Sequence, residues 1–571
     1  MELKNWIYQN KSLNKDEIDA MSKKYGFNSM ISTILLNRGI HTDKEVKAYI
    51  SKSISHIHHP MGLKDVEKAA EIIKKHIDAK NRITVYGDYD VDGITSTALM
   101  YMFLKELDAN VDYYIPDRFD EGYGMNIPAI NKLIKNGTKL IITVDCGITA
   151  VAETSFAKLK QVDVIITDHH TCKEKLPEAD AVINPKQPGC EYPFKELAGV
   201  GVAFKVILAL AVSYNLKASD YFNKYCEIVT VGTIADVVPL LDENRIIVDK
   251  GLSMLQNTRF KGIKALIEIA GIADKDITST SVSFAIAPRI NAAGRMGDAK
   301  LAVRLLLSED DNEAYSLAKE LNDANIKRQN TEVEIYNEAI DMIASDCDFE
   351  KNKVIVLCKK GWHDGVIGIV ASKICDLYSR PCILITYDDN FSAKGSGRSI
   401  EGFNLFDALA GCGDILSNFG GHAIAAGLSL NPDDTEEFKN RINEYANRVL
   451  TAEKMKTNIK IDSEIMPEYV TGKSARVLAK LEPFGVGNPK PVFSMPGLTV
   501  VSMSRMGIDE KHIRIKFKHN NMYFQAVGFG MGRYSEFFNV GDTVEIAFTM
   551  DMNYFSGTES LQLMLKDMRY S

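Results

Sequence analysis

Length, composition and charge exclude several classes of protein. The chain has 571 residues, 45% hydrophobic and 25% charged, which is typical of a globular protein with more than one core. Its net charge of −8 gives no overall attraction to nucleic acid, although basic residues can still line a local path. No apolar stretch approaches the length that spans a membrane, so we expect no membrane insertion.

The nine cysteines and the first residues bear on the cellular compartment. The cysteines show no CxxC pair, so we expect reduced thiols in a cytoplasmic protein. Residues 1–6 lack the apolar core of a signal peptide, so we expect none.

Residues 1–80 have a helical pattern with little chemistry, and an alternating pattern follows them. Strands are expected at 82–86, 111–115, 139–144 and 163–167, and helices at 94–107, 127–135 and 149–159. Such alternation predicts a parallel sheet with right-handed crossovers. We therefore assign residues 81–300 to a first α/β domain.

The sequence pattern of the second half of the chain predicts a helix, a second α/β domain and a β-rich domain. A charged helical pattern without Gly or Pro over 310–346 predicts a connector helix, assigned to residues 301–350. A second α/β domain is expected over 351–455, with strands at 354–357 and 382–385 around a helix at 366–378. Alternating strands over 456–571 indicate a small β-barrel. The predicted fold class is α/β: a parallel-sheet domain, a long helix, a second α/β domain and a C-terminal barrel.

Acidic and histidine side chains follow four apolar runs in the first α/β domain. The polar residues are Asp88, Asp90 and Asp92 after 83–86, Asp145 after 140–144, Asp168, His169 and His170 after 164–167, and Asp236 after 228–234. We expect each run to be a strand, because open parallel sheets bind ligands beyond the carboxyl ends of their strands. A single Asp at a strand end is more often a helix cap, but four such ends together favour a metal centre.

The residue types restrict the metal. Residues 88–93 begin like the loop of an EF-hand, but Leu99 replaces the Glu of the twelfth position and a strand precedes the loop. Carboxylates and imidazoles without thiolates suit Mn²⁺, Mg²⁺ or Zn²⁺ and disfavour structural zinc. Several carboxylates suggest two ions, which would activate water, neutralise a phosphate and stabilise the leaving oxygen.

These residues also carry a family resemblance. Four segments resemble the motifs of the DHH phosphoesterase superfamily: 87–93, 144–147, 167–170 and 232–239. Four more are similar to segments of its RecJ family of single-strand-specific exonucleases: 287–296, 361–370, 395–399 and 481–489. Residues 420–427 resemble the glycine-rich motif of the accessory DHHA1 domain. The resemblance runs from about residue 30 to the end, in the family's order.

The resemblance implies a nuclease that degrades single-stranded DNA from 5′ to 3′, releasing 5′-mononucleotides with two Mn²⁺ or Mg²⁺ ions, in DNA repair and recombination. The metal ligands that it implies are Asp88, Asp90, Asp92, Asp145, His169 and Asp236. Asp145 would be catalytic as the carboxylate shared between the ions, and His170 would orient or polarise the phosphate. Pyrophosphatase-type members carry a metal-binding His where this chain has Tyr86, so Tyr86 would either stack on a base or pack in the core.

The resemblance also implies substrate contacts. Arg118, Ser396 and Arg398 would hold the 5′-phosphate, and Arg289 or Arg295 a neighbouring phosphate, with Arg289, Arg295, Ser396 and Arg398 in glycine- and proline-rich loops. His422 would approach the substrate closely or pack at the start of a helix.

In the C-terminal module, basic and apolar residues alternate. One strand face would carry His512, Arg514, Lys516 and Lys518, with Tyr523, Phe524 and Tyr554 nearby. This pattern predicts a nucleic-acid-binding face on an oligonucleotide-binding barrel, and a solvated strand face is the alternative.

Two other functions remain open from the sequence. One is a DHH phosphodiesterase on short oligonucleotides or cyclic dinucleotides, although such relatives are typically shorter. The other is a binding protein that kept the fold, which would be expected to lack several of the ligands present here. The expected partner is single-stranded DNA; a helicase and a single-strand-binding protein are family-level expectations, and a monomer is expected.

Overall fold

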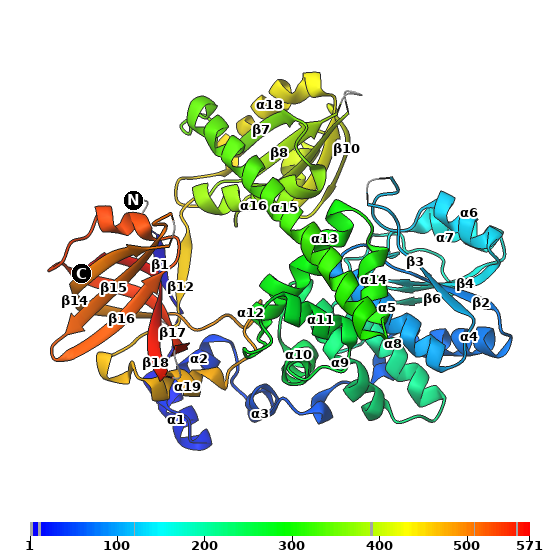
Figure 1. Cartoon of the computed structure of the whole chain (residues 1–571), viewed down its shortest axis with the longest axis horizontal. Coiled ribbons are helices and arrows are strands. Elements are labelled where there is room, and N and C mark those ends of the chain that lie inside the picture. The colour runs from blue at the N-terminus through cyan, green and yellow to red at the C-terminus, as the bar shows by residue number, and fades with distance from the viewer. Residues whose placement is uncertain (1–3, 10–12, 119, 389–391, 508, 556–557) are drawn as a thin grey trace. The chain divides into compact units, whose positions relative to one another are not determined.

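The computed structural model describes residues 4–9, 13–118, 120–388, 392–507, 509–555 and 558–571 (Figure 1). Contacts divide the chain into two units. Unit 1 comprises Met1–Ile40, Lys327–Lys480 and Pro491–Ser571, and unit 2 comprises His41–Ile326 and Leu481–Lys490. The first 80 residues, predicted as one helical segment, are therefore divided between the units. In the described part of the chain, no helix combines the length and hydropathy needed to cross a membrane.

Unit 2 is built on a parallel five-stranded sheet with the order β3-β2-β4-β5-β6. Its strands are β2 (Arg82–Tyr86), β3 (Val111–Tyr114), β4 (Thr138–Val144), β5 (Asp163–Thr167) and β6 (Ala181–Ile183). The four predicted strands are confirmed, and β6 was not predicted. Their apolar runs are almost wholly buried because helices cover both faces of the sheet.

The helices form a layer on each face of this sheet. One face packs on α4 (Val66–Asp78), α5 (Val91–Glu106) and α8 (Gly199–Ser213). The other packs on α6 (Ile127–Lys135) and α7 (Val151–Leu159). Both layers bury the apolar side chains of the strands, as expected of a doubly wound α/β domain.

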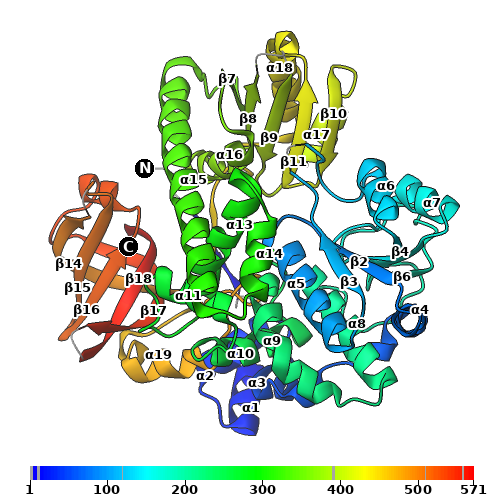
Figure 2. The same ribbon diagram turned by 45° about the vertical axis from the view of Figure 1, so that its right-hand side comes forward.

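Further helices of unit 2 lie beyond the sheet, and most of them share its apolar core. They are α3 (Asp43–Ser51), α9 (Ala218–Ala235), α10 (Asp242–Leu255), α11 (Lys261–Ile269), α12 (Ser279–Ser281), the π-turn Val282–Ile286, α13 (Ala287–Met296) and α14 (Lys300–Leu307). Helix α15 (Asp311–Asp346) continues from unit 2 into unit 1, in agreement with the helix predicted at 310–346 (Figure 2).

One predicted strand is wrong. Residues 228–234 belong to helix α9, so Asp236 follows the end of a helix. A short run rich in Ile and Val does not distinguish a strand from a buried helix segment. Here the helix is stabilised by close packing on α5, where a Cβ on Gly232 would lie 2.3 Å from Oγ1 of Thr95.

The second α/β domain lies in unit 1, and its mixed sheet has the order β10-β11-β9-β8-β7. Its elements are β7 (Ile355–Lys360), α16 (Asp364–Tyr378), β8 (Cys382–Tyr387), β9 (Ala393–Arg398), α17 (Leu405–Ala410), β10 (Leu416–Gly421), β11 (Ala425–Leu430) and α18 (Thr435–Val449). Among the described strand pairs of this sheet, β7 with β8 is parallel and the others are antiparallel. Helices α17 and α18 pack on the sheet through a shared apolar core.

The C-terminal part of unit 1 is a barrel. Strands β14 (Phe493–Met506), β15 (His512–His519), β16 (Met522–Gly528), β18 (Thr558–Tyr570) and β17 (Thr543–Phe555) follow one another, and pairing of β17 with β14 closes the ring. The rest of unit 1 comprises β1 (Asn5–Tyr8), α1 (Lys15–Tyr25), α2 (Ser29–Asn37), β12 (Asn458–Ile461), β13 (Ser463–Glu464) and α19 (Gly472–Ala479). Two α/β domains, a long helix and a barrel confirm the predicted fold class.

Candidate metal centre

The carboxyl end of β2 carries three of the predicted ligands. Asp90 is the N-cap of α5, where its side chain accepts a hydrogen bond from the Gly93 amide at 3.0 Å. A Cβ on Gly93 would lie 2.6 Å from the carbonyl oxygen of Asp88, so only glycine allows this sharp turn. The turn brings Asp88 and Asp92 into the interior, where each is at most 2% exposed.

Residues after β4 and β5 complete the edge of the sheet. Asp145 has a φ of 60°, and its amide donates to the Thr167 carbonyl of the neighbouring strand. Asp168 accepts hydrogen bonds from the Ile148 amide at 2.9 Å and from Nδ1 of His170 at 2.7 Å. Asp168 therefore orients the loop and one imidazole, as a positioning residue, and we did not include it among the predicted ligands.

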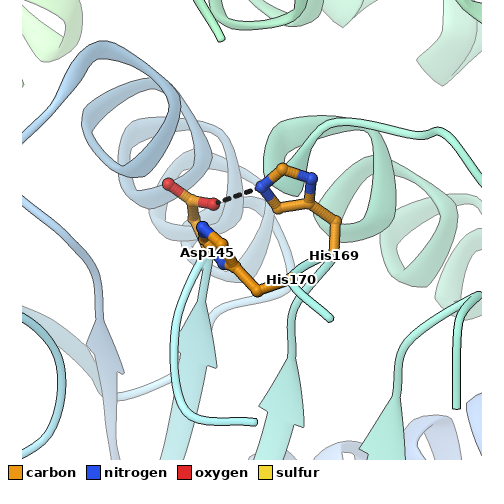
Figure 3. Close-up of side chains that lie close together, drawn as sticks. All are labelled: Asp145, His169 and His170. Atoms are coloured by element: carbon orange, nitrogen blue, oxygen red, sulfur yellow. Dashed lines mark ion pairs between the residues drawn. The ribbon is translucent and has the colours of Figure 1, made fainter. Parts of the chain in front are cut away.

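The structure brings all six predicted ligands together. Three groups of side chains could each hold a cation: Asp88, Asp90 and Asp145; Asp92, His169 and Asp236; and Asp145, His169 and His170. Within each group, the candidate ligand atoms lie within 4.8 Å of one another. Asp145 is common to the first and third groups, so it links an all-carboxylate subsite to a subsite that contains His169 (Figure 3).

His169 is the centre of the second subsite. Its Nε2 lies 3.2 Å from an oxygen of Asp145, 3.6 Å from Asp236 and 3.9 Å from Asp92. Buried atoms without a hydrogen-bond partner in the described structure include both ring nitrogens of His169 and one oxygen each of Asp88, Asp145 and Asp236. Buried polar atoms in native proteins are normally paired, so atoms orphaned together fit a bound cation.

The electrostatics of the cluster also fit a cation. Burial and then neighbouring carboxylates raise the pKa of Asp92 to about 7 and that of Asp236 to about 9. The same causes hold the pKa of Asp88 and of Asp145 well above the ordinary range. Burial, and then the nearby His170, lower the pKa of His169 to about 3, so its imidazole is neutral and free to coordinate. A divalent cation would relieve the repulsion among these carboxylates.

His170 differs from His169. Although burial lowers its pKa, the hydrogen bond to Asp168 raises it, and the net shift is upward. Because Nδ1 is bonded to Asp168, Nε2 is the nitrogen available to a substrate oxygen.

The amino end of α8 was not predicted as part of the site. The Gly199 and Val200 amides donate to the two oxygens of Asp92 at 2.6 and 2.8 Å. A Cβ on Gly199 would lie 2.4 Å from an oxygen of Asp145, so glycine is required where the helix meets the carboxylates. A helix terminus fixes Asp92 through its free amides and its dipole. The glycines of 199–201 were a usable signal, but their partner is more than 100 residues away.

Tyr123 is a second neighbour that the sequence reasoning missed. Its hydroxyl lies 3.3 Å from the Asp145 carbonyl and 3.3 Å from Nδ1 of His170. The flanking Gly122 and Gly124 both have positive φ, which forms the turn that carries Tyr123 over the centre.

The prediction that Tyr86 stacks on a base is wrong. Its side chain has no exposed surface and belongs to the core under α6. The hydroxyl donates to the Gly124 carbonyl at 3.0 Å and accepts from the Asn126 side chain at 3.3 Å. A buried ring with satisfied polar atoms is a packing residue, which was the alternative interpretation.

The predicted arginines of unit 2 have different surroundings. Arg118 stacks over the Tyr89 ring at 5.0 Å, and its charge lowers the pKa of Asp88 against the larger effects of burial and Asp90. Arg289 and Arg295 lie on helix α13, so their placement in loops is wrong. Arg289 donates to the Ala285 carbonyl and to the Asn322 side chain, which uses part of its guanidinium within unit 2.

The other predicted substrate residues lie in unit 1. Ser396 and Arg398 are two residues apart on β9, a strand and not a loop, and Arg398 donates to the Ser396 hydroxyl at 3.2 Å. Gly368 on α16 lies against this pair, where a Cβ would be 2.7 Å from the Ser396 hydroxyl. His422 is exposed in the turn between β10 and β11. The structure brings Ser396 and Arg398 together, and their role stays a prediction.

The barrel has the predicted alternation on β15. Arg514, Lys516 and Lys518 are exposed while the intervening apolar residues are buried. The Lys516 ammonium lies 4.7 Å from the centre of the Tyr523 ring, and Tyr523 is 54% exposed. Phe524 is 7% exposed and so faces the core, and the side chain of Tyr554 falls outside the described ones.

Comparisons with known proteins agree with this architecture. Family models match over three ranges: the DHH family N-terminal domain at residues 82–233, the DHHA1 domain at 351–448 and the RecJ OB domain at 461–567. The single-stranded-DNA-specific exonuclease RecJ of Bacillus subtilis is 39% identical over 554 residues, which cover 97% of this chain and 69% of the relative. The Escherichia coli protein of the same name is 33% identical over 564 residues, covering 94% and 95%.

A solved structure shows the same fold. The crystal structure of RecJ from Thermus thermophilus in complex with Mn²⁺ matches with a TM-score of 0.85 and 29% identity, covering 99% of this chain and 80% of that one. The motifs, the fold and the relatives therefore agree, and this chain belongs to the RecJ family of single-stranded-DNA-specific exonucleases.

Proposed function

We propose that this chain is a metal-dependent exonuclease that degrades single-stranded DNA from the 5′ end and releases 5′-mononucleotides. The observation that carries the proposal is the position of Asp145: it groups with Asp88 and Asp90, and its carboxylate lies 3.2 Å from Nε2 of His169, which groups with Asp92 and Asp236. Two Mn²⁺ or Mg²⁺ ions held there would polarise the scissile phosphate, supply the nucleophile from water and stabilise the leaving oxygen. The relatives are named as single-stranded-DNA-specific exonucleases, which supports the substrate class. Repair and recombination are the processes that we propose for it.

The chain's own residues divide the work around those ions. Asp88 and Asp90 would hold one ion, Asp92, His169 and Asp236 the other, and Asp145 both. His170, raised in pKa and fixed by Asp168, would donate a hydrogen bond from Nε2 to a phosphate oxygen as negative charge grows on it. The rigid sheet edge and the α8 amides keep these groups in place before the substrate binds.

Selection of the 5′ end requires cations beyond the metal centre. We propose that Arg118 and the Ser396–Arg398 pair hold the terminal phosphate, because guanidinium groups bind phosphate oxygens in a bidentate manner. Arg289, Arg295 and His422 are proposed to contact neighbouring parts of the strand. The exposed basic face of β15, with Tyr523, suits the strand further from the cleaved end.

The setting in the cell is also proposed. All nine cysteines are free thiols, which suits the cytoplasm, where single-stranded DNA arises. A helicase would supply that DNA, and a single-strand-binding protein would compete for it or deliver it. We propose that the enzyme acts as a monomer.

A time course of cleavage tests the function directly. Single-stranded DNA labelled at its 5′ end is incubated with the protein and Mn²⁺, with EDTA and duplex DNA as controls. We expect immediate release of labelled mononucleotide, which EDTA abolishes. A ladder of shortening labelled strands would show entry from the 3′ end instead. Cleavage of short oligonucleotides or cyclic dinucleotides alone would favour the alternative phosphodiesterase.

A further inference from the structure

A hollow of about 200 Å³ lies on unit 2, one residue along the chain from Asp236. Its walls come from the segment after α9, from α12 with its π-turn, and from residues 484–486. Val237, Phe284 and Val486 line it and are 63%, 79% and 46% exposed. Large apolar side chains gathered at one exposed place mark a binding surface more often than chance does.

Val237 has an unusual backbone. Its φ is 63°, a left-handed conformation that β-branched residues rarely adopt. The conformation places an apolar side chain at the surface directly after a predicted metal ligand. Strain of this kind persists where the surrounding structure enforces it, and it is concentrated at functional sites.

Phe284 lies on a second distortion. The π-turn Val282–Ile286 precedes Pro288, whose ring would clash with the Phe284 carbonyl in a regular α-helix. The wider turn avoids this clash, and Arg289 donates to the Ala285 carbonyl that the turn leaves accessible. Single π-turns are rare and are frequently found at functional sites.

Hydrogen bonds join the wall formed by residues 484–486 to the other two walls of the hollow. The Leu240 amide donates to the Val486 carbonyl at 2.8 Å, and the Ser279 hydroxyl donates to the Phe484 carbonyl at 2.6 Å. A Cβ on Gly485 would lie 2.7 Å from the Leu240 side chain, so this wall approaches closely only because residue 485 is glycine. The hollow is therefore a built feature of unit 2.

The residues that line the hollow indicate which class of ligand it could bind. Among the described lining residues none is charged, and the polar ones include the hydroxyl-bearing Ser279, Thr280 and Ser283. A phosphate would lack a cation there, whereas a planar, uncharged ring could pack on Phe284 and exchange hydrogen bonds with the hydroxyls of Thr280 and Ser283. The volume is below the roughly 300–1,000 Å³ of pockets that enclose drug-sized ligands, so a single ring system fits better than a whole nucleotide.

We propose that this hollow is a nucleobase subsite, in which the base of a nucleotide next to the scissile phosphate packs against Phe284 and Val237. The inference rests on the proposed function, because it requires a phosphate held at Asp236, whose neighbour in the chain, Val237, lines the hollow. Stacking on an aromatic face tolerates any base, as an exonuclease without sequence preference requires. The subsite would fix the register of the strand at the metal centre.

Abasic substrates test the subsite. Single strands with one abasic nucleotide at each of the first positions are compared with intact DNA by kcat/KM. For the wild-type protein we expect one position where the missing base lowers kcat/KM by about five- to a hundred-fold, as the loss of one base–aromatic stack would. Phe284→Ala should lower kcat/KM on intact DNA by a similar factor and be insensitive to the abasic nucleotide at that position. Phe284→Trp should retain both the rate and the sensitivity.

Two controls separate the outcomes. Leu159→Ala removes another exposed apolar side chain, 81% exposed on α7, and should leave the rate and the abasic profile unchanged. The thermal transition of Phe284→Ala should match that of the wild type, because the ring is exposed. If Phe284→Ala keeps the wild-type sensitivity at every position, the subsite is overturned while the nuclease function stands. If the wild type cleaves no single-stranded DNA, the proposed function itself fails.

Discussion

Two clusters of buried charge lie within unit 2, and they differ in how their charges are matched. In the first, Lys205 on α8 and Glu243 on α10 are each at most 1% exposed and form a direct ion pair. Glu243 also accepts from the Tyr192 hydroxyl at 2.6 Å and from the His58 amide at 3.0 Å. In the second, the metal centre, like charges are buried together and several polar atoms have no partner in the described structure.

The difference separates a structural site from a functional one. Burial shifts pKa values in both clusters: it lowers that of Lys205 and raises those of Asp92 and Asp236. Only the matched cluster is explained by the fold alone, because each buried charge has an opposite charge and hydrogen bonds. Unmatched carboxylates cost stability and are retained where a ligand offsets that cost.

The largest effect is expected at Asp145. Asp145→Asn should reduce cleavage by more than about 100-fold, beyond the roughly 10–100-fold that loss of a supporting residue costs at metal sites. The same change should raise the melting temperature in EDTA, because it removes one of several repelling carboxylates. Cleavage assays with Mn²⁺ and melting curves measure both, with the exposed Asp108→Asn as control. Activity close to wild type would overturn the shared-carboxylate assignment.

A substitution in the matched cluster, the Lys205–Glu243 pair, should lower the stability of the fold. Lys205→Met leaves Glu243 buried without its cation, and we expect a loss of about 3–5 kcal/mol in the free energy of unfolding. Urea denaturation measures it, and Lys80→Met, which breaks an exposed pair with Asp108, should leave the free energy of unfolding almost unchanged. Equal effects of the two changes would remove the contrast between the clusters.

A smaller effect is expected where α8 meets the centre. Gly199→Ala pushes a methyl group against Asp145 and displaces the amides that hold Asp92, so the dissociation constant for Mn²⁺ should rise by about 10–100-fold. Isothermal titration calorimetry provides the measurement. Gly201→Ala, whose Cβ would have atoms of the Leu197 side chain as its nearest neighbours, at 3.3 Å and beyond, should bind Mn²⁺ like the wild type. Unchanged affinity in Gly199→Ala would show that these amides do not position the ligand.

The stability of the protein should change gradually with pH. Unfolded carboxyl groups titrate near pH 4, but the folded pKa values of Asp92 and Asp236 are about 7 and 9. The metal-free fold therefore binds protons that the unfolded chain has lost, and it loses stability as pH rises from about 4 through those values. Mn²⁺ competes with the same protons, so the stabilisation by Mn²⁺ should grow from pH 6 to 8, by at most about tenfold in affinity per proton per pH unit. Melting curves with and without Mn²⁺ check this, and a pH-independent shift would contradict it.

Most of the metal centre could be predicted because the sequence signal of a buried strand lies within a few consecutive residues. The apolar runs before Asp88, Asp145 and Asp168 have the length and residue types of buried parallel strands, and such strands place the residues after them at one edge of the sheet. Patterns among neighbouring residues also predicted the long helix α15 and the alternating strand β15. The family resemblance added the ligand roles, the polarity and the substrate class, which no periodicity could supply.

The features that the sequence did not determine depend on contacts between distant segments. Asp236 reaches the centre from a helix because α9 packs on α5, and a run of Ile and Val looks alike in a strand and in a buried helix. Tyr86 is a core residue because α6 covers it. The hydrogen bonds from the α8 amides to Asp92 and the hollow beside Phe284 form only when residues far apart in the chain meet. Backbone amides and cavities have no sequence pattern that would predict them. The sequence therefore determined which groups carry the chemistry, and the tertiary structure decided which of them are held, exposed or buried.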